Sequence, residues 1–305
     1  MPFELESVNV FLVRMDGGYL MVDAGLGTEE CFEALLRALE QLGVHWSEIR
    51  ALLITHAHPD HIGLVPRLRE ASGAPVWMHP IESRHLEEFA DPEKRAAALR
   101  LALDMAGTPG EMQAAIDKSF SVVRPSIHPI RPERFLQGGE TIPVEGGELE
   151  VFWTPGHSPG HICLYHRQRK YLIAGDHILE TITPHVSWRP DRDALGDYLD
   201  SLALFPGIEV DSVLPSHGEP FGDHRRRIEA IGEHHAARCA RLAAALLGGP
   251  RTAHALVPQL WNRILSPFHY HFAVLEVLAH CDYLERRGGL KADRKNGGAV
   301  EWTSS

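Results

Sequence analysis

Four side chains that can bind a metal ion lie within six consecutive residues: His56, His58, Asp60 and His61. Imidazole nitrogens and carboxylate oxygens this close together suit zinc, iron or manganese, because these ions accept mixed nitrogen and oxygen ligands. Histidine is plentiful in this chain, with 20 residues, so a single pair would mean little. The group of four predicts a metal-binding segment, whose remaining ligands must come from elsewhere in the chain.

Two elements are expected to hold this segment in place. The apolar run 51–54 before it has the length and composition of a buried strand. In the segment 61–70 after it, Ile62, Val65 and Leu68 have the spacing of one helix face. The four side chains therefore belong to a strand-to-helix loop at the carboxyl end of a strand, where open α/β sheets bind ligands.

The start of the chain predicts a hairpin and a helix. Two β-rich runs, 8–14 and 19–23, flank an Asp-Gly-Gly sequence that is typical of a tight turn. Residues 28–42 are helix-like. These elements would precede the strand that carries the metal-binding segment.

The segment resembles the His-x-His-x-Asp-His signature of the metallo-β-lactamase superfamily. The remaining ligands of that family are a histidine after a strand, an aspartate closing the next strand and a late histidine. This sequence has them in order, as His157 in Thr-Pro-Gly-His, Asp176 in Ala-Gly-Asp and His217 in Pro-Ser-His-Gly. The resemblance covers about residues 8–220 and implies an α/β fold of the αββα sandwich type.

The resemblance also implies two adjacent ion sites that share one carboxylate. The first ion would be held by His56, His58 and His157, the second by Asp60, His61 and His217, and both by Asp176. Zinc is the expected metal, with iron and manganese as alternatives. A hydroxide bridging the two ions would attack a carbonyl carbon or a phosphorus atom, and Asp60 would orient that hydroxide.

Other polar residues have weaker claims to the site. Asp23 closes a strand and is a candidate to support the ligands, or else it caps the following turn or helix. His185 is a candidate catalytic residue that donates to the substrate or acts as an acid, with a plain surface histidine as the alternative. His79 and His161 are expected to be structural, and His177 could point either way.

Composition limits the classes of function. The formal net charge of −11 disfavours nonspecific binding to nucleic acids or anionic membranes. No run of about 18 apolar residues predicts a membrane span. The four cysteines are scattered, and residues 1–6 lack a basic start and an apolar core. We therefore expect a cytoplasmic protein with reduced thiols and no signal peptide.

The chain is expected to form two domains. Residues 1–222 would form the metallo-β-lactamase-fold catalytic domain, with a helical insertion at about 81–120 that covers the site or forms an interface. Residues 223–305 would form a C-terminal domain of three helices and a hairpin, which resembles a winged helix. A recognition helix over 268–286 would be acidic and largely apolar, so packing or formation of a homodimer is favoured over DNA binding.

The resemblance implies an enzyme, a dinuclear-metal hydrolase acting on a small thioester, ester or lactone. The alternative is a metal-dependent endoribonuclease or phosphodiesterase, in which Arg225–Arg227, Arg238 and Arg241 would contact phosphates. A regulator that uses the fold only as a scaffold is less favoured, because every expected ligand is present. We therefore expect a small molecule as the partner, with nucleic acid possible but not favoured.

Overall fold

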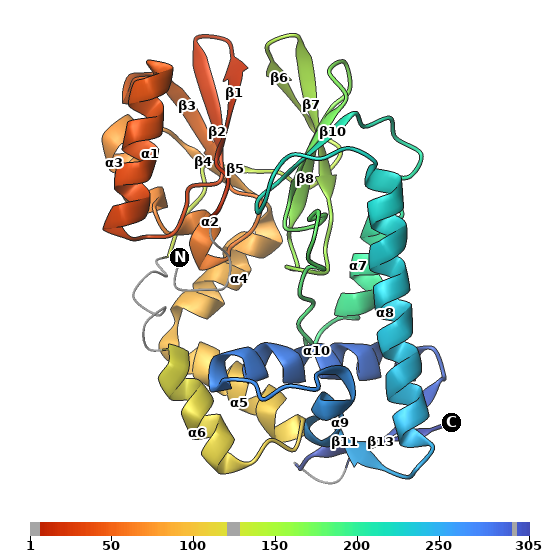
Figure 1. Ribbon diagram of the computed structural model, residues 1–305. Coiled ribbons are helices and arrows are strands. Elements are labelled where there is room, and N and C mark those ends of the chain that lie inside the picture. Colours follow the sequence, from red (N-terminus) through yellow and green to blue (C-terminus); the bar gives the residue numbers. More distant parts are fainter. Residues whose placement is uncertain (1–6, 121–128, 295–297) are drawn as a thin grey trace.

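The computed structural model of the chain describes residues 7–120, 129–294 and 298–305. Two five-stranded sheets lie side by side, and a three-stranded sheet lies at the other end of the molecule (Figure 1). The first sheet has the order β1(Phe11–Met15), β2(Gly18–Val22), β3(Ile49–Leu53), β4(Val76–Met78) and β5(Arg134–Phe135). The second has the order β10(Ser212–Pro215), β9(Tyr171–Gly175), β8(Ile162–His166), β7(Gly147–Trp153) and β6(Thr141–Val144).

The first sheet combines a hairpin with parallel strands. β1 and β2 pair antiparallel around a tight turn, and Gly17 in that turn has a φ of 72°, which glycine adopts without a steric penalty. β2, β3, β4 and β5 then pair in parallel. The predicted hairpin and the predicted strand before the metal-binding segment are confirmed. Because parallel strands end at the same edge, that edge collects the loops that follow them.

Helices cover the outer faces of both sheets. α1(Glu29–Leu42) and α3(Val65–Ser72) pack on the first sheet, and α7(Ala194–Leu202) and α8(His224–Leu246) pack on the second (Figure 1). Apolar side chains of both sheets, such as Leu53 and Leu164, fill the space between them. This αββα arrangement confirms the predicted fold class. The sequence did not predict α7, β5 or the short 3-10 helix Trp46–Glu48.

The single helix predicted over 61–70 is wrong, because the chain forms two helices there, α2(Pro59–Ile62) and α3. The backbone of Gly63 passes so close to Gly27 that a Cβ on Gly63 would lie 2.1 Å from the Gly27 nitrogen. At this crossing Ala24 donates to the carbonyl of His61, and Leu64 donates to that of Gly25. These tertiary hydrogen bonds replace helical ones and separate α2 from α3.

The C-terminal part contains the predicted helices and hairpin. Its elements are α8, β11(Arg251–Thr252), α9(Ala253–Leu260), α10(Pro267–Arg286), β12(Leu290–Arg294) and β13(Val300–Ser304). The strands form a sheet of order β11-β13-β12, and the predicted hairpin turn at 295–297 lies outside the described residues. The likeness to a winged helix and the boundary at residue 222 stay predictions.

The predicted insertion is helical and comprises α4(Pro80–Ala90), α5(Pro92–Met105) and α6(Gly110–Ser119). Leu103 of α5 and Ile116 of α6 belong to the same buried cluster as Leu278 of α10 and Trp302 of β13. Figure 1 shows α5 and α6 beside α9 and α10, away from the two large sheets. The insertion therefore shares its core with the C-terminal helices. Within the described part of the chain, no helix is long and apolar enough to cross a membrane.

Candidate metal centre

All seven side chains predicted as metal ligands converge at one edge of the two large sheets. Four loops carry them: His56, His58, Asp60 and His61 follow β3, His157 follows β7, Asp176 follows β9, and His217 follows β10. Pro59 at the first position of α2 sets the helical φ, so that Asp60 and His61 sit in its single turn. Strand ends separated by more than 100 residues of sequence thus meet in one place.

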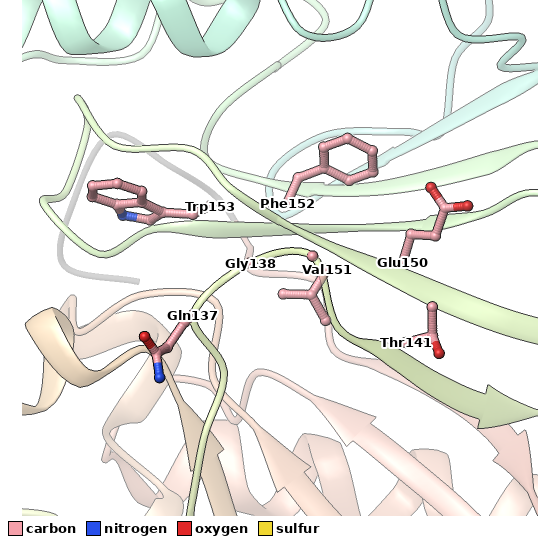
Figure 2. A pocket seen from close by; sticks show the side chains of 8 residues that line it. Gln137, Gly138, Thr141, Glu150, Val151, Phe152 and Trp153 are labelled. Carbon is pink, nitrogen blue, oxygen red and sulfur yellow. The ribbon is translucent and has the colours of Figure 1, made fainter.

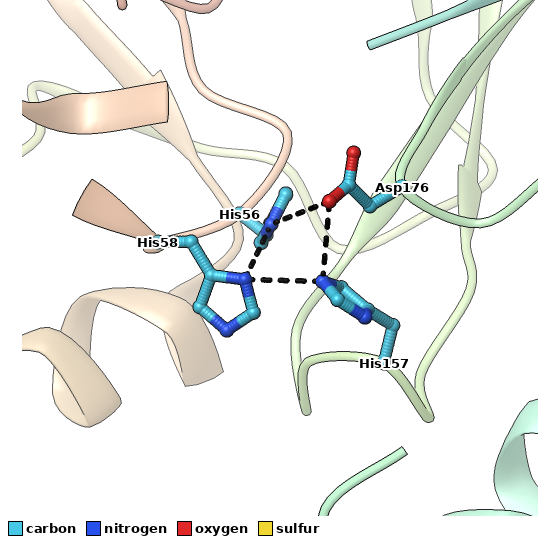
Figure 3. A group of neighbouring side chains, drawn as sticks. All are labelled: His56, His58, His157 and Asp176. Atoms are coloured by element: carbon cyan, nitrogen blue, oxygen red, sulfur yellow. Dashed lines mark hydrogen bonds and ion pairs between the residues drawn. The ribbon is translucent and has the colours of Figure 1, made fainter. Parts of the chain in front are cut away.

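The first group contains three imidazoles and one carboxylate (Figure 3). His58 Nδ1 lies 2.9 Å from His56 Nε2 and 3.0 Å from His157 Nε2. Asp176 Oδ2 lies 3.5 Å from His157 Nε2 and 4.0 Å from His56 Nε2. Three ring nitrogens and a carboxylate oxygen facing one another in this way can surround a single cation.

The second group lies on the other side of Asp176. His217 Nε2 is 3.3 Å from Asp60 Oδ2 and 3.4 Å from Asp176 Oδ1, and His61 Nε2 is 3.7 Å from each of these oxygens. His61 Nε2, His217 Nε2 and Asp176 Oδ1 are buried and have no hydrogen-bond partner among the described residues. Buried polar atoms without partners are costly, and a cation among these three would satisfy all of them. The donor set therefore fits a second metal ion.

Hydrogen bonds at Nδ1 fix the tautomer of candidate histidine ligands, so that Nε2 is free to bind a metal ion. His157 Nδ1 donates to the backbone carbonyl of His185 at 2.8 Å, and His217 Nδ1 donates to that of Ser7 at 2.6 Å. A carbonyl can only accept, so in each neutral ring the proton is on Nδ1 and the lone pair on Nε2 faces the centre. His56 Nδ1 similarly lies 3.1 Å from the hydroxyl of Thr55.

Asp23, predicted as a supporting residue, lies directly behind the second group. Its Oδ2 is 2.9 Å from His61 Nδ1, and its Oδ1 accepts from the backbone nitrogen of Thr55 at 2.8 Å. Asp23 has a φ of 62°, an uncommon conformation for a residue other than glycine. The carboxylate thus links the end of β2 to the loop that carries the ligands.

Electrostatics differ between the two groups in the metal-free protein. Burial, together with the neighbouring imidazoles, holds the pKa of His56 and of His58 well below the usual range. Burial also acts to lower the pKa of His61 and His217, but neighbouring carboxylates outweigh it: those of Asp60, Asp23 and Asp176 for His61, and those of Asp176 and Asp60 for His217. They raise the pKa of His61 to about 9 and that of His217 to about 11. The imidazoles of the first group are therefore favoured in the neutral form, whereas the imidazoles of the second group must lose protons when they bind a cation.

The histidines expected to be structural make contacts outside the two groups. His161 Nδ1 lies 2.8 Å from the hydroxyl of Thr154, and its Nε2 accepts from the backbone nitrogen of Asp176 at 3.1 Å. His79 caps α4, because its Nδ1 accepts from the nitrogen of Ile81 at 3.1 Å. His161 therefore supports the backbone that carries a ligand.

His185 contacts His157 through its backbone carbonyl, and its ring contacts other protein groups. Its Nε2 lies 2.7 Å from the hydroxyl of Ser187, and its Nδ1 lies 3.3 Å from Glu276 Oε2 on α10. Burial, together with nearby Arg238, lowers the pKa of His185 to about 3. The catalytic roles of Asp60 and His185 stay predictions.

Glu82 is a buried residue of the site that the sequence did not reveal. Its Oε2 accepts from the nitrogen of Ala57 at 2.7 Å, and its Oε1 accepts from the hydroxyl of Ser158 at 2.5 Å and the nitrogen of Gly160 at 2.7 Å. One carboxylate thus ties the loop after β3 to the loop after β7. A glutamate in the first turn of a helix is too common to have signalled this role.

A cavity of about 540 Å³ lies elsewhere, beside β6 and β7 (Figure 2). None of the seven predicted ligands lines it, and its one carboxylate, that of Glu150, accepts from Arg167 at 2.7 Å. This cavity is therefore separate from the two groups described above.

Comparison with known proteins agrees with this geometry. Residues 4–217 match the family model of the metallo-beta-lactamase superfamily, and residues 239–305 match that of the metallo-beta-lactamase-like C-terminal domain. Probable metallo-hydrolase YqjP of Bacillus subtilis is 27% identical over 298 residues, which cover 93% of this chain and 89% of that protein. Acyl-coenzyme A thioesterase MBLAC2 of Gallus gallus is 30% identical over 71% of this chain and 74% of that protein. Hydroxyacylglutathione hydrolase GloC of Haemophilus influenzae is 29% identical over 47% of this chain and 55% of that protein.

Two solved structures are similar over the whole chain. A metallo-beta-lactamase family protein from Thermus thermophilus has a TM-score of 0.85 and 33% identity, covering 100% of this chain and 96% of that one. A beta-lactamase domain protein from Burkholderia ambifaria has a TM-score of 0.87 and 28% identity, covering 100% and 90%. Family model, fold and clustered ligands agree, and the chain therefore belongs to the metallo-beta-lactamase superfamily as one of its metal-dependent hydrolases.

Proposed function

We propose that this chain hydrolyses a small thioester, ester or lactone with two divalent metal ions bound by the seven side chains. The observation that carries the proposal is the position of Asp176 between the two groups. Its Oδ2 lies 3.5 Å from His157 Nε2, and its Oδ1 lies 3.4 Å from His217 Nε2. One carboxylate shared by two sets of imidazoles suits the paired-metal hydrolases, in which the ions are about 3.5–4 Å apart.

The proposed chemistry divides between the ions and the protein. When bound, two such ions would polarise the substrate oxygen and bring the pKa of a water close to neutrality. Burial lowers the pKa of His56, His58 and His157 and so favours their neutral form, in which they would hold an ion without reducing its charge. Asp60, whose Oδ2 lies 3.3 Å from His217 Nε2, would orient the attacking water and accept its proton. Zinc is the proposed metal, because the donors are imidazoles and carboxylates, and iron and manganese are alternatives.

A thioester is the favoured substrate within the proposed range. The names of two relatives, an acyl-coenzyme A thioesterase and a hydroxyacylglutathione hydrolase, both denote hydrolysis of thioesters. A thiolate is a good leaving group, so an enzyme that activates water and polarises the carbonyl needs no separate nucleophile. These names support the class of substrate and leave the acyl group and the thiol open.

The phosphodiesterase alternative has less support from the arginines that would contact phosphates. Arg225 donates to the carbonyls of Pro206 and Ile208, and Arg241 donates to that of Gln259. Arg238 pairs with the buried carboxylate of Glu276. Guanidinium groups that already donate to protein carbonyls or to a carboxylate are less available to phosphates, so this alternative is the less favoured.

Metal analysis followed by a substrate panel tests the proposal. The protein, loaded in turn with zinc, iron and manganese, is assayed with S-lactoylglutathione, an acyl-coenzyme A, a simple lactone, bis-p-nitrophenyl phosphate and a short RNA. We expect thioester turnover in the wild type and its loss in Asp176→Ala. Phosphodiester cleavage without thioester cleavage would overturn the substrate proposal. Full activity in Asp176→Ala would overturn the mechanism.

A further inference from the structure

We infer that the C-terminal domain positions a ligand of the metal centre through a relay from Arg238 and Glu276 to the loop of His185. The inference rests on the metal centre proposed above. It gives Glu276 a positioning role: this carboxylate touches neither the ligands nor the substrate, and acts by fixing the backbone carbonyl that orients the His157 imidazole.

The relay begins at the ligand. His157 Nδ1 donates to the carbonyl of His185 at 2.8 Å, so the direction of this carbonyl sets both the tautomer and the tilt of the His157 ring. Residue 185 belongs to the long connection between Asp176 and α7, which contains no regular helix or strand. Such a connection needs anchors if its carbonyl is to hold one orientation.

The anchors come from the C-terminal helices. On α10, Glu276 Oε2 lies 3.3 Å from His185 Nδ1, and the carbonyl of Leu275 accepts from the nitrogen of Trp188 at 3.2 Å. The ring of Phe272 packs edge-on against that of His185, with centroids 5.1 Å apart. On α8, Arg227 donates to the carbonyl of Ile182 at 2.7 Å. Figure 1 shows α10 running crosswise beneath the two large sheets, between them and the C-terminal strands.

The carboxylate of Glu276 is itself held in place. It is buried, with 7% of the residue exposed, and Arg238 of α8 pairs with its Oε1. The guanidinium of Arg238 also stacks over the ring of Trp261, 4.7 Å from its centroid. A buried ion pair costs desolvation energy and is therefore weak as a source of stability, but it fixes the positions of both partners.

A third metal site is the competing explanation of the same residues. His235, Glu276 and His280 are buried and bring three possible ligand atoms within 4.8 Å of one another. Hydrogen bonds engage most of these atoms, because His280 Nδ1 donates to the Glu276 carbonyl at 2.7 Å and its Nε2 lies 3.1 Å from His235 Nδ1. Of the ring nitrogens of the two histidines, His235 Nε2 alone has no partner among the described residues. Both carboxylate oxygens of Glu276 are also engaged. The contacts therefore favour a hydrogen-bonded relay over a bound ion.

The test replaces the relay without leaving a buried charge unpaired. In the variant Glu276→Met with Arg238→Met, both partners become apolar, whereas Glu276→Gln with Arg238→Met keeps an oxygen that can accept from His185 Nδ1. The matched control is Glu285→Met with Arg294→Met, in which Glu285 lies on the same helix and the two groups form an exposed pair at 2.6 Å. Zinc affinity is measured by competition with a chromophoric chelator. The cobalt-substituted proteins give the visible spectrum of the ligand set.

We expect the Met/Met variant to bind one of its two zinc ions about 10–100-fold more weakly, with an altered cobalt spectrum. The Gln/Met variant should recover most of the affinity, and the control should match the wild type. Equal affinities in the wild type and the Met/Met variant would overturn the relay while leaving the proposed function intact. A third equivalent of zinc that disappears in His280→Gln would overturn it in favour of a metal site.

If the Met/Met protein does not fold, a second variant, His185→Ala, tests the relay. His185→Ala removes the imidazole but keeps the carbonyl, and the relay predicts the same loss of affinity, about 10–100-fold. Unchanged affinity in His185→Ala would overturn the inference. A wild-type protein that binds no metal at all would instead refute the proposed function.

Discussion

The carboxylate of Asp23 lies 2.9 Å from Nδ1 of His61 and stands directly behind that ligand. In the neutral ring that binds a metal, this carboxylate favours the proton on Nδ1 and leaves the Nε2 lone pair facing Asp60 and Asp176. Asp23 is almost completely buried, with 1% of the residue exposed, so its charge is little screened by water. The position of this carboxylate therefore affects how strongly the second group can bind a cation.

Replacing Asp23 with asparagine should lower the affinity for the second ion about 10–100-fold and leave the affinity for the first ion nearly unchanged. Asparagine tolerates the positive φ of 62° at this position, so the backbone should be retained. Zinc binding is measured by competition with a chelator, with Asp16→Asn in the exposed hairpin turn as the control. Equal affinities for both ions in Asp23→Asn and the wild type would show that the carboxylate does not tune the centre.

Replacing Glu82 with alanine should destabilise the metal-free protein strongly. The change leaves three donors without their acceptor, on Ala57, Ser158 and Gly160. Each orphaned buried donor costs about 1–3 kcal/mol, and the two loops that carry ligands lose their link. Urea unfolding measures the free energy of unfolding, with Glu87→Ala on the exposed face of the same helix as the control. Losses of similar size in the two variants would contradict the bridging role.

Acid should destabilise the metal-free protein through buried histidines outside the centre. Burial lowers the pKa of His280 and of His271 to about 3, whereas an unfolded histidine has a pKa of about 6.5. A depressed pKa contributes stability above about pH 6.5 that is lost as the pH falls towards about 3. Between these pH values, each such histidine should change the free energy of unfolding by about 1.4 kcal/mol per pH unit.

The variant His280→Gln isolates one of these contributions. We expect its free energy of unfolding to fall less steeply between about pH 6.5 and pH 4 than that of the wild type. The difference in slope should correspond to the uptake of about one proton fewer on unfolding. The surface variant His45→Gln should keep the wild-type slope. Parallel pH profiles of His280→Gln and the wild type would show that this histidine does not drive the acid sensitivity.

The convergence of the seven candidate ligands could be predicted from the sequence because each lies in a short motif directly after a strand. The supporting contacts could not, because they join residues far apart in the chain. Glu82 reaches Gly160 across 78 positions, and His185 reaches Glu276 across 91. Neither pair has a local spacing or composition that distinguishes it. Only the folded chain shows which of the many glutamates and histidines meet.

The dependence on long-range contacts also explains which helix boundaries could be predicted from the sequence. Thr28 before α1 and Gly43 after it are local caps, and the helix predicted there is confirmed. The break at Gly63 depends on the approach of Gly27 from another part of the chain, so periodicity alone predicted one continuous helix. The shared core of α5, α6 and the C-terminal helices also depends on tertiary packing. Local signals therefore identified elements, and long-range contacts decided how they divide and pack.

Calorimetric titration of the metal-free protein with zinc tests the central claim most directly. The geometry predicts two zinc ions per chain in the wild type. In Asp176→Ala, which loses the carboxylate shared by both groups, it predicts markedly weaker binding of both ions. A wild-type protein that binds no zinc, iron or manganese, or an Asp176→Ala variant that binds two ions as tightly as the wild type, would contradict it.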